Sequence, residues 1–95
     1  MKVKVKFFAL VRELTGKREE VVDLEDQATV RALLDRLVKQ YGDKFQEYVF
    51  DPKSMEPRVH VQFLIDGRNV MLMRGLETTL KDGNSFAILP PVGGG

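Results

Sequence analysis

Alternating apolar and polar residues in three stretches of the chain predict three β-strands, over residues 2–8, 18–24 and 58–65. Successive side chains of a strand point to opposite faces of the sheet, so each stretch has one apolar face. The residues expected to face the core are Val3, Val5, Phe7, Val22, Leu24, Val59, Val61, Phe63 and Ile65. Charged residues in the second stretch suit a sheet edge.

Phe8 breaks the alternation, because it falls on the same side as the lysines of the first strand. Two interpretations are open: a strand-end residue tucked under a loop, or an apolar contact for a partner protein. The alternation alone favours the first. Residues 9–17 follow as a predicted connection, with Gly16 as its turn residue and Leu14 in the core.

Apolar residues at helical spacing predict one main helix between the second and third strands. Thr29 is a suitable N-cap and Gly42 a suitable C-terminal residue for it. The apolar stripe comprises Val30, Leu33, Leu34, Leu37, Val38 and Tyr41. A short second helix is predicted over residues 43–50.

Two turn signals divide the remainder of the chain. Asp66-Gly67 predicts a hairpin into a short return strand over residues 69–72, and Asp82-Gly83 precedes a last strand over residues 85–89. We therefore predict an α+β fold of the β-grasp (ubiquitin-like) type: a mixed sheet of four to five strands with one main helix on one face. The first and last strands are expected to lie side by side in the sheet centre. Residues 1–95 are read as a single domain, with 90–95 as a flexible, extended C-terminal glycine tail.

Composition narrows the classes of function. Charged residues make up 31% of the chain and nearly cancel, at a formal net charge of +1, whereas nucleic-acid-binding domains usually show a basic excess. No apolar run approaches the roughly 20 residues that cross a bilayer. We expect a cytoplasmic protein with neither nucleic acid nor membrane as a partner.

Side-chain chemistry is equally restricted. The chain contains no cysteine and a single histidine, His60, which excludes thiolate catalysis and a cysteine- or histidine-ligated metal site. His60 is read as a solvated strand residue. We expect no metal site, no bound cofactor and no catalysis by the chain itself.

The C-terminal carboxylate is the remaining candidate for chemistry. The chain ends in Gly93, Gly94 and Gly95, which have no side chains and could enter a narrow enzyme channel. Pro90 and Pro91 would hold the segment that leaves the sheet extended and away from it. If an ATP-using enzyme adenylated the carboxylate, the carboxyl group would become a good acyl donor. The activated acyl group could then accept sulfur or be transferred to an amine. An idle end of the chain is the alternative.

Two motifs, FFALVRELTG at residues 7–16 and LKDGNSFAILPPVGGG at 80–95, resemble the two ends of the MoaD family, the small subunit of molybdopterin synthase. The ThiS sulfur carriers share the fold and the diglycine but fit these motifs less well. The small archaeal modifier proteins fit about equally.

The resemblance implies a non-catalytic sulfur carrier. A ubiquitin-activating-type enzyme would adenylate Gly95 with MgATP, a sulfur donor would convert it to a thiocarboxylate, and a MoaE-type large subunit would use the sulfur to build molybdopterin for a molybdenum or tungsten cofactor. Gly94 and Gly95 match the family diglycine. The resemblance also reverses the interpretation of Phe8, and it implies a partner-binding set of Phe8, Val70, Leu89, Pro90, Pro91, Val92 and Gly93. Two alternatives stay open: a ubiquitin-like modifier joined through Gly95 to lysines of substrate proteins, and a β-grasp interaction module with an idle tail.

Overall fold

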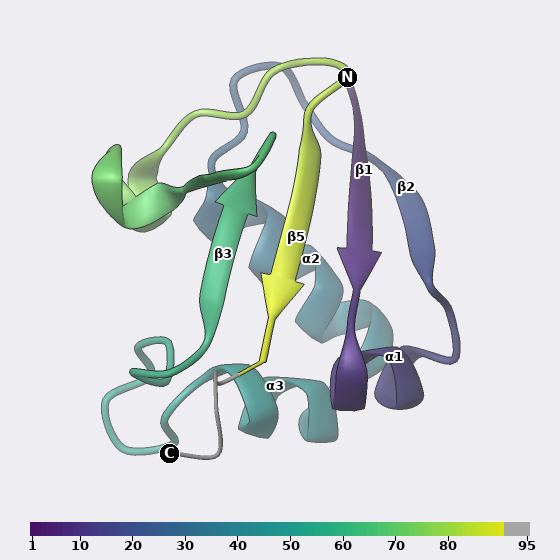
Figure 1. Ribbon diagram of the computed structural model, residues 1–95, viewed down its shortest axis with the longest axis vertical. Coiled ribbons are helices and arrows are strands. Elements are labelled where there is room, and N and C mark those ends of the chain that lie inside the picture. The colour runs from purple at the N-terminus through teal and green to yellow at the C-terminus, as the bar shows by residue number, and fades with distance from the viewer. Residues whose placement is uncertain (91–95) are drawn as a thin grey trace.

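The computed structural model describes residues 1–90 and contains strands and helices in an α+β arrangement (Figure 1). The elements are β1 (Lys2–Phe7), α1 (Ala9–Thr15), β2 (Glu19–Asp23), α2 (Val30–Tyr41), α3 (Asp43–Val49), β3 (Gln62–Ile65), β4 (Arg68–Asn69), the 3₁₀ turns η1 (Val70–Leu72) and η2 (Gly75–Glu77), and β5 (Ser85–Leu89). Figure 1 shows α2 and α3 behind the sheet. We call the opposite side of the sheet its open face.

The five strands form one mixed sheet in the order β2-β1-β5-β3-β4. β1 and β5 are parallel neighbours, with Phe7 opposite Ile88, and the other pairs are antiparallel. The first and last strands therefore occupy the middle of the sheet, as the sequence predicts. The β-grasp prediction is confirmed, and β2 is an edge strand.

The core lies between the sheet and α2. Apolar side chains at alternate positions of β1, β3 and β5 face the helix, and Val30, Leu33, Leu34 and Leu37 are fully buried on the facing side of α2. The hydroxyl of Thr29 accepts a hydrogen bond from the Ala32 N–H at 3.2 Å, so the predicted N-cap is correct.

Residues 9–15 form helix α1, where the sequence predicts a connection. The helix has only seven residues, which is too short to display a clear helical period in the sequence. Val11 is its buried residue, and Leu14, expected in the core, is only half-buried. Gly16 ends the helix with φ at 74°, a left-handed conformation that glycine adopts without strain.

The third strand is shorter than predicted. β3 begins at Gln62 because the chain turns just before it, where the Val61 N–H donates to the Arg58 carbonyl at 3.1 Å. Val59, expected to face the core, is 90% exposed. His60 is exposed, as expected.

The return strand is also shorter, and this corrects one candidate site residue. β4 comprises only Arg68 and Asn69. The side-chain oxygen of Asn69 then accepts from the Met71 N–H at 2.8 Å and begins η1. That turn places Val70 in the core at 0% exposure. Val70 therefore cannot belong to an exposed partner-binding surface.

A polar cluster joins edge strand β2 to the end of α2. The Glu20 carboxylate accepts hydrogen bonds from the Tyr41 hydroxyl and, at 2.7 Å, from Gln40 Nε2, and Lys17 Nζ lies 3.6 Å away. Burial alone would raise the pKa of Glu20, but these donors and the Lys17 charge outweigh it and hold that pKa below its ordinary value. Burial and the bond to Glu20 raise the pKa of Tyr41.

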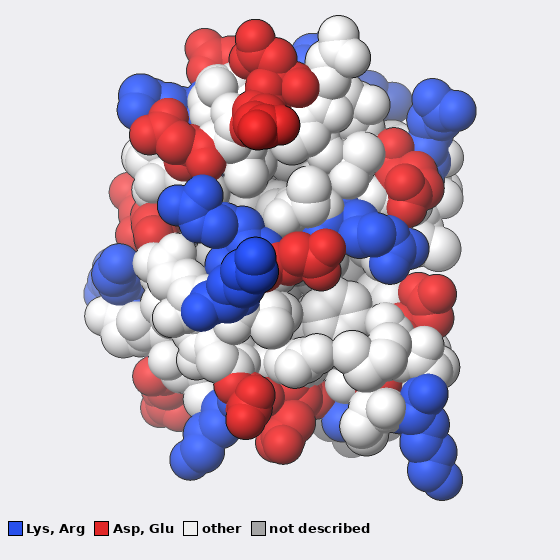
Figure 2. Space-filling model, turned by 180° about the vertical axis from the view of Figure 1, so that it is seen from behind, with Lys and Arg blue, Asp and Glu red and all other residues white. Residues whose placement is uncertain are grey.

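None of the helices within residues 1–90 combines the length and the apolar character that crossing a bilayer requires. On the helix-covered side, Figure 2 shows Lys and Arg interspersed with Asp and Glu, so neither sign of charge dominates that face.

Candidate functional site

The end of β5 is the point from which the glycine tail departs. Leu89 is the last residue of β5 and pairs with Gln62 of β3, and both are half-buried. Pro90 follows and is also half-buried. The remaining predicted tail residues, Pro91, Val92, Gly93, Gly94 and Gly95, lie outside the described residues.

Phe8 and Leu89 lie level with each other on neighbouring strands. β1 and β5 run parallel with Phe7 opposite Ile88, so the next residue along each strand falls on the other face of the sheet. Phe8 has an extended backbone, with φ at −128° and ψ at 155°, and thus continues the line of β1. The structure brings together the two apolar residues that the resemblance places at a partner-binding surface.

Two further apolar residues extend this surface. Ala87 precedes Leu89 by two positions, and Leu64 lies opposite Ala87 on β3. Both are half-buried on the open face. We call Phe8, Leu64, Ala87 and Leu89 the exit patch. Leu64 and Ala87 were not among the predicted site residues, although the alternation of the third and fifth strands places them on the same face.

Charged residues occupy the open face beyond the exit patch. Lys2, Lys4 and Lys6 are exposed along β1. Across the sheet edge, Lys2 Nζ contacts the Asp23 carboxylate at 3.0 Å, and Lys6 lies opposite Glu19. The open face thus combines an apolar zone beside the tail exit with a zone of mixed charge toward β2.

Residues 1–90 contain no group of three His, Asp or Glu side chains placed to hold a metal ion. The arrangement instead suits presentation: the central strand ends beside an apolar patch, and the chain continues from there to its carboxyl-terminal glycines.

A comparison with protein families matches residues 5–95 to the ThiS family. The chain is 34% identical over 95 residues to small archaeal modifier protein 3 of Haloferax volcanii, covering 100% of both chains. It is 29% identical over 93 residues to the molybdopterin synthase sulfur carrier subunit of Drosophila sechellia, covering 98% of this chain and 90% of the other.

The fold agrees with these sequence matches. The crystal structure of small archaeal modifier protein 1 from Haloferax volcanii superimposes with a TM-score of 0.85 at 30% identity, covering 100% of both chains. The likeness at the two ends of the sequence therefore extends over the whole chain. The chain belongs to the ThiS family, within the ubiquitin-like β-grasp proteins that serve as sulfur carriers and protein modifiers.

Proposed function

We propose that this protein is the sulfur carrier of a molybdopterin synthase and that its reactive group is the Gly95 carboxylate. The observation that carries the proposal is the position of the exit patch. It lies at the end of β5, the central strand that leads into the tail. A rigid strand and an apolar docking surface give a partner enzyme a fixed point from which the tail begins.

The chemistry requires activation, because a carboxylate is a poor electrophile. A carboxylate oxygen of Gly95 attacks the α-phosphorus of MgATP on a separate adenylating enzyme, and pyrophosphate leaves. Hydrosulfide released by a sulfur donor then attacks the acyl carbon and expels AMP, so a C–S bond replaces the C–O bond to AMP and the thiocarboxylate forms. Gly94 and Gly95 suit this step because they have no side chains to obstruct a narrow channel.

The carrier, now with a thiocarboxylate at Gly95, then delivers its sulfur to a MoaE-type large subunit. Phe8 and Leu89 of the exit patch contact that subunit, and the segment from Pro90 to Gly93 leads into its active site. Partly exposed apolar residues clustered where the tail begins are typical of such a surface. The carrier itself performs no catalysis.

A second candidate function is protein modification, in which Gly95 is joined to substrate lysines. The full-length likeness to a small archaeal modifier protein favours it. Both functions share the adenylation step and differ only in the nucleophile that displaces AMP.

Measuring the intact mass of the protein isolated from its native cells distinguishes the sulfur carrier from the protein modifier. A gain equal to the exchange of one oxygen for sulfur at Gly95 supports the carrier. Ladders of conjugates that disappear on deletion of Gly94 and Gly95 support the modifier. Extension of the chain by one alanine after Gly95 should abolish both products, and products that survive the extension would show that the tail is idle.

The docking surface is tested separately. Leu89→Lys should weaken binding to the large subunit by about tenfold or more, since a central apolar contact is worth roughly 2 kcal/mol. Val21→Lys is the matched control, because Val21 is 56% exposed on edge strand β2, away from the exit patch. Equal affinities for the two variants by calorimetry would rule out the exit patch as the docking surface.

A further inference from the structure

Methionine sulfur is the most easily oxidised side-chain group that this chain contains. The sequence has no cysteine and four methionines, Met1, Met55, Met71 and Met73. A hydroperoxide converts a methionine thioether to a sulfoxide, which changes a flexible apolar side chain into a polar one. The position of each sulfur in the fold therefore decides which methionine a dissolved oxidant modifies first.

The four methionines differ widely in their exposure to solvent. Met71 is 75% exposed and Met55 is 49% exposed. Met73 is half-buried and packs against the core, and the side chain of Met1 is only 3% exposed. Because oxidation follows exposure, the expected order is Met71 first, Met55 second, and Met73 and Met1 last.

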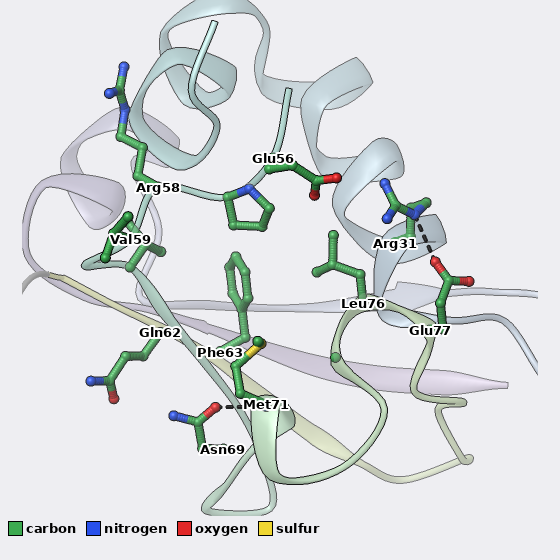
Figure 3. A pocket seen from close by; sticks show the side chains of 13 residues that line it. Arg31, Glu56, Arg58, Val59, Gln62, Phe63, Asn69, Met71, Leu76 and Glu77 are labelled. Carbon is green, nitrogen blue, oxygen red and sulfur yellow. Dashed lines mark hydrogen bonds and ion pairs between the residues drawn. The ribbon is translucent and has the colours of Figure 1, made fainter. Parts of the chain in front are cut away.

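The surroundings of Met71 leave its sulfur open to small oxidants. Met71 lines a hollow beside β3 together with Phe63 and Leu76, and the volume of this hollow is about 610 Å³ (Figure 3). A water molecule occupies roughly 30 Å³ in the liquid, so a molecule as small as hydrogen peroxide can enter the hollow. Gly75 lies next to the sulfur, where a Cβ would be 3.9 Å from Met71 Sδ, and glycine has no side chain to cover it.

Hydrogen bonds hold Met71 in this exposed position. The Met71 N–H donates to the side-chain oxygen of Asn69 at 2.8 Å, and the Met73 N–H donates to the Val70 carbonyl at 2.9 Å. The η1 turn that these bonds close buries Val70 completely and directs Met71 outward. The exposure of Met71 therefore belongs to the fold and is not the result of a frayed segment.

Oxidation at Met71 should be compatible with the fold, whereas oxidation at Met73 should not. A sulfoxide oxygen needs a hydrogen-bond donor, and at an exposed side chain water supplies it. Met73 packs against the core, where the added oxygen would be a buried polar atom. Modification of Met71 is thus a change of surface rather than damage to the core.

We propose that Met71 is the site at which hydroperoxides modify this protein, and that the modification makes an apolar part of its surface polar while the fold is kept. The Met71 sulfur attacks one peroxide oxygen, and an S–O bond forms as the O–O bond breaks. The hydroxyl proton passes to the other oxygen, which leaves as an alcohol, or as water when the oxidant is hydrogen peroxide. The sulfur loses two electrons and the peroxide gains them. The modification is the same whether the protein acts as a sulfur carrier or as a protein modifier.

A time course with hydrogen peroxide, followed by peptide mass spectrometry, tests the order of oxidation. The protein should carry a C-terminal carboxylate, so that the methionines hold its only sulfur atoms. Met71 and Met73 share the tryptic peptide of residues 69–74, so fragment ions are needed to place the oxygen. Met71 should react first and Met73 about tenfold more slowly or less, and in urea the rates should become similar. Oxidation of Met55 or Met73 as fast as Met71 in the folded protein would overturn the proposal.

Hydrophobic-interaction chromatography and thermal unfolding test the effect on the surface, in a Met55→Leu background that removes the other exposed sulfur. Protein that has gained one oxygen should elute earlier and melt within about 3 °C of untreated protein. Met71→Leu should keep its retention after the same treatment, and Met73→Leu, the matched control, should still shift. A shift that persists in Met71→Leu, or a singly oxidised protein that melts more than about 10 °C lower, would show that the modification lies elsewhere or disrupts the fold.

Discussion

The hydrogen bond from Tyr41 to Glu20 can be tested by removing one oxygen atom. Tyr41→Phe deletes the hydroxyl donor but keeps the ring, whose centroid lies 5.8 Å from that of Phe7 and 6.0 Å from that of Phe45. The substitution therefore changes the polar cluster between β2 and α2 with little effect on aromatic packing. Glu20 keeps Gln40 and Lys17 as partners.

The expected loss of unfolding free energy in Tyr41→Phe follows from the charge and the burial of the Glu20 carboxylate, which accepts the hydrogen bond. A hydrogen bond to a charged group contributes about 1.5–3 kcal/mol when both partners are shielded from water. The Glu20 side chain is 17% exposed and retains its other donors, so we expect a loss near the lower end, about 1–2 kcal/mol at neutral pH. For a chain of this length that corresponds to a decrease in melting temperature of roughly 5–15 °C.

The loss of unfolding free energy in Tyr41→Phe should decrease as the pH is lowered. The folded-state pKa of Glu20 lies below its ordinary value of 4.5, so its ionised form stabilises the fold above that value. This contribution is lost as the pH falls from 4.5 through the lowered folded-state pKa. Tyr41→Phe removes part of it, so the difference in unfolding free energy between variant and wild type should be largest at neutral pH and shrink in acid.

Urea denaturation followed by circular dichroism, at neutral pH and at acidic pH, measures this difference. Tyr48→Phe is the matched control: burial raises the Tyr48 pKa, but its hydroxyl makes no hydrogen bond within residues 1–90. That variant should lose less than about 0.5 kcal/mol. Equal losses for the two variants, or a Tyr41→Phe loss that does not change with pH, would refute the assigned hydrogen bond.

Two further substitutions test other parts of the fold. Thr29→Ala removes the side-chain acceptor of the Ala32 N–H and should cost about 1 kcal/mol of unfolding free energy, and a loss below about 0.3 kcal/mol would contradict the capping role. Val70→Ala should cost about 2 kcal/mol because Val70 is fully buried, without changing affinity for the large subunit. Val21→Ala, at an exposed site, should be close to neutral, and reduced binding by a folded Val70→Ala protein would restore Val70 to the docking surface.

The main elements of the fold could be predicted because their patterns are long or bounded by strong signals. The stripe of α2 spans three turns between Thr29 and Gly42, and β1 alternates over six residues. The placement of β5 beside β1 followed from the fold type rather than from any local pattern. The turn signals at Asp66-Gly67 and Asp82-Gly83 separated the later strands correctly.

The errors arose where a local interaction overrides the pattern. Residues 58–61 continue the alternation of β3, but the turn closed by the Arg58 carbonyl takes Val59 out of the sheet. Asn69 likewise ends β4 by holding the Met71 N–H, which buries Val70. Neither the backbone bond from Val61 to Arg58 nor the bond from Met71 to the Asn69 side chain can be read from the hydrophobic pattern.

The structure brings two of the predicted site residues together. Phe8 and Leu89 were named from the resemblance, and the parallel register of β1 and β5 places them side by side. Leu64 and Ala87 could have been added from alternation together with the strand order. The strand order is a long-range property, and the sequence specifies it only through the fold as a whole.

The central position of β5 has a consequence for how the protein folds. Its neighbours β1 and β3 are made earlier in synthesis, yet neither can pair across the middle of the sheet until Ser85–Leu89 has been added between them. Contacts between the two ends of a chain slow folding, since a large loop must close before they form. The strand that leads to the glycines is thus synthesised after both of its neighbours and is needed to complete the sheet. A chain truncated before Ser85 should therefore lack both the tail and a stable exit patch.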